Sequence, residues 1–187
     1  MTTEKEWVEI LRGDIEKVMT QQNLSVRTGV RLPYQIYVAN YAGESAQRPN
    51  MEQPHGYQTD LLIAERINSS DGWVPRVVVE FKLGHVSTHD ALTYSAKAAT
   101  HKDLHPYLRY GIIVGGLPGA VPRRLIRHGH QFDFMMTLAS GDKLTASEHA
   151  YVCELLQDEV RASREMSLLL SGSKSHTRLV HRKLLSK

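Results

Sequence analysis

Residues 74–83 read VPRVVVEFKL, and this stretch decides the fold. Its three consecutive valines are typical of a central strand that is covered on both faces, and Gly84 ends the run. Glu80 and Lys82 lie near the end of the stretch, and residues two positions apart project from the same face of a strand. Charges beside such an apolar run are costly unless they have a purpose. The stretch therefore predicts a central strand that carries a functional pair.

The segments on either side of this strand alternate between helical and extended patterns. In chain order, the predicted elements are a helix over 4–22, strands at 32–41, 57–67 and 74–83, a helix over 87–103, strands at 107–116 and 132–139, and a helix from 145 to about 170. The helix between the third and fourth strands is a crossover, which makes those two strands parallel. We therefore predict an α/β fold with a mixed central sheet flanked by helices, in the order αβββαββα.

Length and composition place this pattern in one domain. The chain has 187 residues, of which 41% are hydrophobic, enough for a single core. Its one cysteine, Cys153, cannot form an internal disulfide, so we expect a buried thiol in a reducing, cytoplasmic protein. No apolar run approaches the length of a membrane span, and the charged N-terminus lacks a signal-peptide core, so no membrane partner is expected.

Positive charge is concentrated in two segments. The net charge is +3, yet residues 172–187 hold five basic residues and no acid, which leaves −2 for residues 1–171. We predict a domain over 1–171 and a basic tail over 172–187. A second acid-free segment, 104–132, contains the four arginines 109, 123, 124 and 127. Basic segments of this kind favour a phosphate-bearing partner.

Asp60 stands directly before the apolar run Leu61–Ile63 of the predicted strand at 57–67. If that strand pairs with 74–83 through the turn at 68–72, then Asp60, Glu80 and Lys82 converge. Two carboxylates form a good site for Mg²⁺, which polarises phosphate and lowers the pKa of bound water. The lysine adds a positive charge to this site.

These residues resemble the motif of the PD-(D/E)xK nuclease superfamily, which includes most type II restriction endonucleases. The match consists of Thr59-Asp60, nineteen intervening residues, and Glu80-Phe81-Lys82, with Thr59 in place of the proline. The resemblance covers about residues 4–116. It implies a restriction-endonuclease-like core of a helix, three antiparallel strands, a crossover helix and a parallel strand.

The resemblance also implies a chemistry. Asp60, Glu80 and the main-chain carbonyl of Phe81 would bind Mg²⁺, and Lys82 would orient or activate the attacking water. The implied function is a Mg²⁺-dependent endonuclease for double-stranded DNA that leaves 5′-phosphate ends, a homodimeric type II restriction enzyme in the first instance. The alternatives are a nuclease selective for junctions or repair intermediates, and an inactive nuclease fold that only binds DNA.

Other candidate residues surround this prediction. In many members of the superfamily, an acid of the first helix joins the site. The candidates in this chain are Glu9 and Asp14, and the sequence does not choose between them. DNA contacts are expected from the loop at 43–56 and from Arg109, Arg123, Arg124 and Arg127. The histidine pairs at 85/89 and 101/105 have a spacing that can bind Zn²⁺ on a helix. Without a supporting motif, we interpret them as surface residues or polar contacts to DNA.

Overall fold

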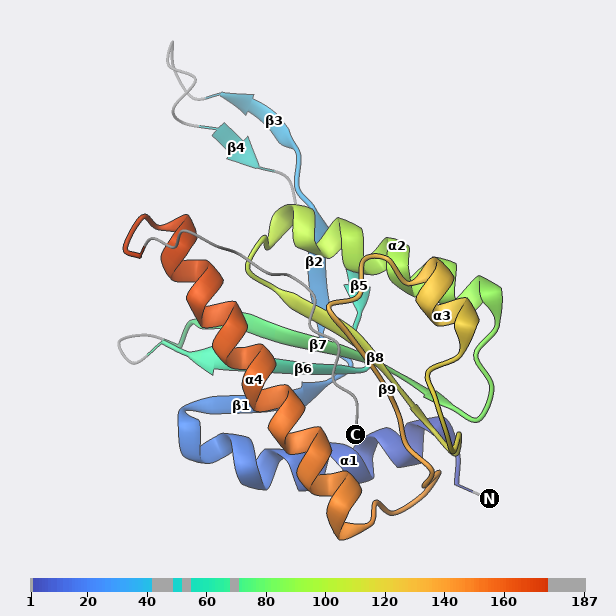
Figure 1. Ribbon diagram of the computed structural model, residues 1–187. Coiled ribbons are helices and arrows are strands. Elements are labelled where there is room, and N and C mark those ends of the chain that lie inside the picture. Colours follow the sequence, from blue (N-terminus) through green and yellow to red (C-terminus); the bar gives the residue numbers. More distant parts are fainter. Residues whose placement is uncertain (1, 42–48, 52–54, 68–70, 175–187) are drawn as a thin grey trace.

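The protein is built on a five-stranded mixed sheet with helices on both faces (Figure 1). It is described by a computed structural model that covers residues 2–41, 49–51, 55–67 and 71–174. In spatial order, the strands are β1 (Leu24–Thr28), β6 (Leu61–Arg66), β7 (Trp73–Leu83), β8 (Arg109–Gly115) and β9 (Phe134–Thr137). Neighbours among β1, β6 and β7 are antiparallel, whereas β8 and β9 run parallel to β7. The predicted α/β class and flanked mixed sheet are confirmed.

In the part of the chain that the structure describes, four α-helices cover this sheet in two pairs. They are α1 (Glu4–Met19), which continues into the 3-10 turn η1 (Thr20–Gln22), then α2 (Thr88–Leu104), α3 (Arg123–His128) and α4 (Ala146–Leu170). α1 and α4 cover one face of the sheet, and α2 and α3 cover the other (Figure 1). As predicted, α2 is the crossover that makes β7 and β8 parallel.

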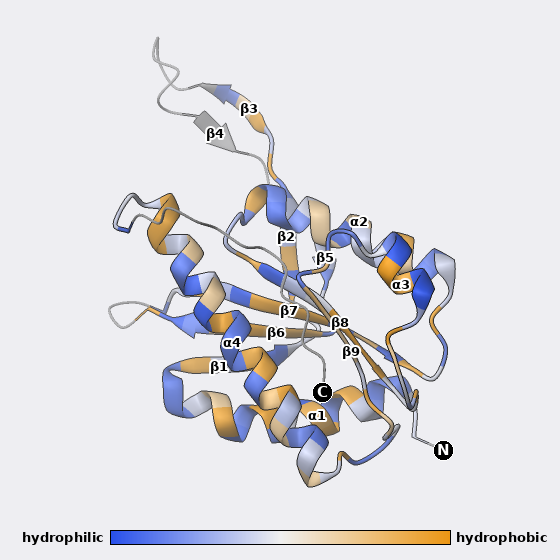
Figure 2. Cartoon of the chain, viewed as in Figure 1, coloured by the Kyte–Doolittle hydropathy of each residue, from blue (hydrophilic) through white to orange (hydrophobic). Residues whose placement is uncertain are grey.

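Strand β7 contributes to both cores because its side chains alternate between the two faces. Val77, Val79 and Phe81 pack toward α1 and α4, whereas Val78 packs toward α2. Figure 2 shows the apolar character of the central strands. Glu80 and Lys82 follow the parity of Val78, so both lie on the face covered by α2.

The strand predicted at 32–41 does not belong to the central sheet, and this part of the prediction is wrong. The segment forms β2 (Arg31–Gln35), which pairs with β5 (His55–Gln58), and β3 (Val38–Tyr41), which pairs with β4 (Pro49–Met51). The first strand of the sheet is instead β1, which the sequence analysis missed. Among the described residues, seven strands therefore separate α1 from α2, where three were predicted.

Helix α1 is anchored to the sheet by Trp7. The indole meets Phe81 edge to face, with ring centroids 5.5 Å apart. It also lies over Gly115, where an added Cβ would fall 2.3 Å from the Trp7 ring. The Trp7 ring can approach this closely because Gly115 has no side chain. Its contacts with Phe81 and Gly115 hold the first turn of α1 beside the end of β7.

The three longer helices begin with capping boxes, at Thr3, Ser87 and Thr145. Cys153 is buried on α4, as expected.

Helix α4 ends near the predicted domain boundary, but most of the predicted tail, residues 175–187, lies outside the described part of the chain. Within the described ranges, no helix is long and apolar enough to cross a membrane.

Candidate active site

The structure brings Asp60 and Glu80 together where β6 begins beside the end of β7. Leu61 is paired with Val79 in the ladder, so the residues that follow on β7 extend past the start of β6. Asp60 occupies this edge, and its Oδ2 accepts a hydrogen bond from the Phe81 backbone N–H at 2.9 Å. The Asp60 and Glu80 carboxyl groups are also within hydrogen-bonding reach of each other.

The Phe81 carbonyl shares this edge. In a β-strand, the N–H and C=O groups of one residue point to the same side. Because the Phe81 N–H donates to Asp60, its carbonyl is directed toward the same side of β7. Two carboxylates and one carbonyl are thus directed toward one region, and all three are oxygen donors of the kind that Mg²⁺ prefers.

Glu80 is the most buried carboxylate of the site, with 1% of its surface exposed. Its Oε1 accepts a hydrogen bond from the Tyr110 hydroxyl and lies 3.8 Å from the Lys97 ammonium. Burial, followed by repulsion from Asp60, raises the pKa of Glu80 to about 7. A divalent cation would relieve both effects, because it stabilises the ionised form. The donor set therefore fits a magnesium ion.

Lys82 lies on the same face of β7 as Glu80, as the sequence predicts. Its Nζ is 3.5 Å from Glu4 Oε1 and 5.4 Å from the centroid of the Tyr94 ring. Burial alone would lower the pKa of Lys82, but the Tyr94 hydroxyl and the Glu4 carboxylate outweigh it and raise the pKa to about 12. Lys82 is therefore a permanent cation, which suits it to charge stabilisation and to holding a water molecule.

The acid that α1 brings to this site is Glu4, and neither Glu9 nor Asp14 contacts it. Glu4 reaches Lys82 and also accepts a hydrogen bond from the Leu83 N–H at 3.2 Å. Glu9 bonds to Thr28 and Arg12, and Asp14 pairs with Lys17. The two predicted candidates lie further along α1, whereas Trp7 anchors its first turn at the end of β7.

The four predicted DNA-binding arginines have different environments. The Arg109 side chain is only 13% exposed, and it pairs with Glu159 at 2.6 Å and with Asp133 at 3.2 Å. These contacts make it a bridge between β8 and α4. Arg123, Arg124 and Arg127 are exposed on α3. Much of the loop predicted to contact DNA, including residues 43–48 and 52–54, lies outside the described part of the chain.

The histidine interpretation is wrong for His101. This side chain is fully buried, its Nε2 lies 3.0 Å from the Leu32 carbonyl oxygen, and its ring stacks on Tyr110. Burial lowers its pKa to about 4, so the ring is neutral. Across the described segments, no group of three or more His, Cys, Asp or Glu side chains is arranged to bind a metal ion. The two-carboxylate site depends instead on the added Phe81 carbonyl.

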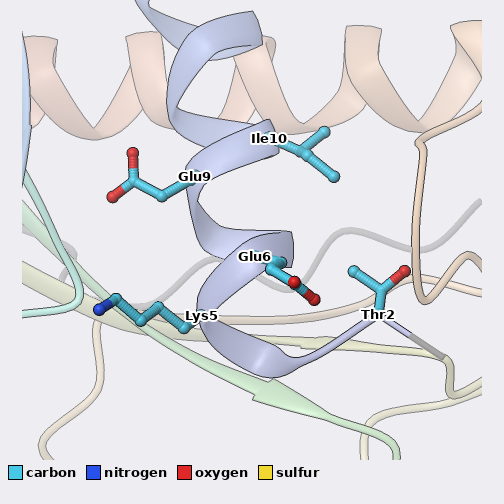
Figure 3. A pocket seen from close by; sticks show the side chains of 5 residues that line it. All are labelled: Thr2, Lys5, Glu6, Glu9 and Ile10. Atoms are coloured by element: carbon cyan, nitrogen blue, oxygen red, sulfur yellow. The ribbon is translucent and has the colours of Figure 1, made fainter.

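Two surface hollows lie outside the carboxylate pair. One, of about 540 Å³, runs along the exposed side of α1 and is lined by Thr2, Lys5, Glu6, Glu9 and Ile10 (Figure 3). The other, of about 250 Å³, lies on the β2–β5 ribbon and is lined by Arg31, Pro33, Tyr34, His55, Gly56 and Tyr57. Only the second approaches the site, because Tyr57 also lies beside Lys97.

Sequence reasoning missed four groups that surround the carboxylates. They are Glu4 of α1, Tyr94 and Lys97 of α2, and Tyr110 of β8. A partial signal exists for Tyr94 and Lys97, which are three residues apart and hence on one side of the crossover helix.

Comparison with known proteins adds no assignment: no protein-family model matches the chain, and no curated protein sequence is significantly similar to it.

Proposed function

We propose that this protein is a Mg²⁺-dependent DNA endonuclease with a core of the PD-(D/E)xK type. The observation that carries the proposal is the meeting of Asp60 and Glu80 at one edge of the sheet, with Lys82 on the same face of β7 as Glu80. A further support is the arrangement of the sheet, in which three antiparallel strands are followed, after a helical crossover, by a parallel one. The resemblance implies the same change from antiparallel to parallel strands, whereas the order of strands along the chain differs, because β2 to β5 are inserted between β1 and β6.

The residues of the site divide the chemical work. Asp60, Glu80 and the Phe81 carbonyl would hold Mg²⁺, which when bound polarises a phosphate and makes water more acidic. Lys82 is cationic, so it stabilises negative charge that develops on the phosphate and orients the attacking water. Glu4 and Tyr94 fix the Lys82 ammonium from two sides. Tyr110 orients the Glu80 carboxylate by donating to it.

The proposed substrate is double-stranded DNA. The exposed arginines of α3 (Arg123, Arg124 and Arg127) provide positive charge at the end of the parallel strands, and Arg124 lies 3.1 Å from His85 in the loop after β7. Guanidinium groups bind phosphates and guanine edges. One site of this kind cuts one strand, so cleavage of both strands requires two copies of the chain. A homodimer matched to a palindromic sequence, as in type II restriction enzymes, meets this requirement.

Plasmid cleavage tests this function. Supercoiled plasmid and phage DNA are incubated with the protein in Mg²⁺ or in EDTA, and the fragment ends are labelled. We expect discrete fragments with 5′-phosphate ends in Mg²⁺ only. Faster cutting of a four-way junction than of linear duplex would instead assign a junction-selective nuclease. DNA binding without cleavage in any divalent metal would assign an inactive binding module and refute the proposal.

A further inference from the structure

Lys97 of α2 points at the carboxylate pair from the helix that covers it. Its ammonium lies 3.8 Å from Glu80 Oε1. The same ammonium lies 5.0 Å from the centroid of the Tyr94 ring and 5.7 Å from that of Tyr57. The side chain is 23% exposed, so Lys97 is held between two aromatic rings and a buried carboxylate rather than extended into solvent.

This environment differs from that of an ordinary surface ion pair. Exposed pairs contribute little, because water and salt screen both charges. Glu80 is almost completely buried, and the two tyrosine rings exclude water from part of the ammonium. The faces of aromatic rings attract a cation electrostatically. Tyr57 and Tyr94 therefore hold a positive charge directly in front of Glu80.

The Lys97 ammonium has the same electrostatic role at Glu80 that a bound metal ion would have. A divalent cation bound between Asp60 and Glu80 must neutralise the same carboxylate that Lys97 already neutralises. Two cations so close to each other repel, and a partly buried site screens that repulsion less than bulk water does.

We propose that Lys97 is an internal counter-ion of the carboxylate pair, which neutralises Glu80 before a divalent cation arrives and competes with that cation for it. The inference rests on the metal site of the proposed function. It assigns Lys97 a positioning role in which it restrains Glu80 and sets how tightly the metal is held. Divalent ions thus bind more weakly than two carboxylates alone would allow.

The test is a calorimetric titration with Mg²⁺ in the absence of DNA, at pH 8.5 to favour ionised Glu80. Lys97→Met keeps the aliphatic stem and removes the charge, so we expect Mg²⁺ to bind about tenfold more tightly than to the unmodified protein. Lys97→Arg keeps the charge and is expected to bind Mg²⁺ no more tightly than the unmodified protein. Circular dichroism verifies that each variant is folded.

Lys102 provides a matched control. It lies on the same helix, its side chain is also 23% exposed, and it pairs with Asp133 rather than with the carboxylate site. Lys102→Met therefore removes the same charge from the same helix, and we expect no change in Mg²⁺ affinity. Equal affinities for the Lys97→Met and Lys102→Met variants would overturn the inference.

The outcome separates this inference from the proposed function. Cleavage of plasmid by a protein whose Mg²⁺ affinity does not respond to Lys97→Met would refute the counter-ion and leave the nuclease standing. Tighter binding of Mg²⁺ by Lys97→Met in a protein that never cuts DNA would support the counter-ion and refute the nuclease. Absence of Mg²⁺ binding in both forms would refute the metal site and, with it, both proposals.

Discussion

The Phe81 backbone N–H donates a hydrogen bond to Asp60 Oδ2 at 2.9 Å, beyond the last ladder pair of β6 and β7. A side chain thus continues the pairing where the backbone of the neighbouring strand turns away, because the Thr59 N–H and carbonyl bond to Val30 and Gly29 instead. Asp60 therefore has two functions, closing the edge of the sheet and presenting a carboxylate to the site.

The two functions of Asp60 are separable by substitution. Asp60→Asn keeps an oxygen that accepts from Phe81, whereas Asp60→Ala leaves that N–H without its acceptor. We expect Asp60→Ala to be less stable than Asp60→Asn by about 1–2 kcal/mol in urea unfolding. Both variants should lose Mg²⁺ binding. Equal stability of the two would show that this hydrogen bond does not hold the edge.

Glu80 makes the stability of the protein depend on pH. Its pKa is about 7 in the folded protein against 4.5 ordinarily, so between these pH values the folded state retains a proton that the unfolded state loses. The stability that this retained proton contributes to the folded state is fully present below pH 4.5 and is lost as the pH rises through 7. Glu80→Gln is neutral at every pH. We expect this variant to be about 1–3 kcal/mol more stable than the unmodified protein at pH 8 without metal.

Thermal or urea unfolding over pH 4–8 measures this effect. The difference between Glu80→Gln and the unmodified protein should shrink toward pH 4, where both side chains are uncharged. Added Mg²⁺ should stabilise the unmodified protein at pH 8 and leave Glu80→Gln unaffected. A constant stability difference across this range would show that burial does not disfavour the Glu80 charge.

The Tyr110 hydroxyl favours the ionised form of Glu80 by donating to it. Tyr110→Phe removes the donor and keeps the ring that stacks on His101. The pKa of Glu80 should rise further, so we expect several-fold slower plasmid cleavage at pH 7 and a smaller defect at pH 9. Tyr107→Phe, whose ring lies beside Arg76, is the control. A defect of the same size at both pH values would contradict this explanation.

Of the three acids Glu4, Glu9 and Asp14 on α1, Glu4 contacts the Lys82 ammonium, so we expect Glu4 to position Lys82. Glu4→Gln removes the charge beside the Lys82 ammonium, so we expect plasmid cleavage to slow several-fold while the fold is retained. Glu9→Gln and Asp14→Asn are matched controls on the same helix and should cut at the unmodified rate. Slower cleavage by either control, with Glu4→Gln unaffected, would show that Glu9 or Asp14, rather than Glu4, is the acid that α1 contributes to the site.

The central strand and the candidate site residues on it were predictable because the sequence signals are local. Three valines followed by Glu80 and Lys82 specify a buried strand and a shared face, and the order of the elements specifies the crossover. Pairing of consecutive strands then brings Asp60 to Glu80, as the structure shows.

The remaining contacts depend on information that is not local. Alternating residues at 32–41 do form strands, but the pattern does not state which sheet they join, and β1 occupies the edge of the central sheet instead. Glu4 reaches Lys82 only because Trp7 packs against Phe81 and over Gly115. Lys97 meets Glu80 only through the docking of α2. Helix docking of this kind is decided by the whole core rather than by one segment.

We propose that Asp60, Glu80 and Lys82 form one metal-dependent centre for phosphodiester hydrolysis. The most direct measurement is the rate of supercoiled plasmid cleavage in Mg²⁺ by the unmodified protein, Glu80→Gln and Lys82→Met, with DNA affinity measured in parallel in Ca²⁺. We predict that both variants bind DNA to within about threefold of the unmodified protein and cut it at least about 100-fold more slowly. Cleavage by either variant at the unmodified rate would show that these residues do not form the catalytic centre.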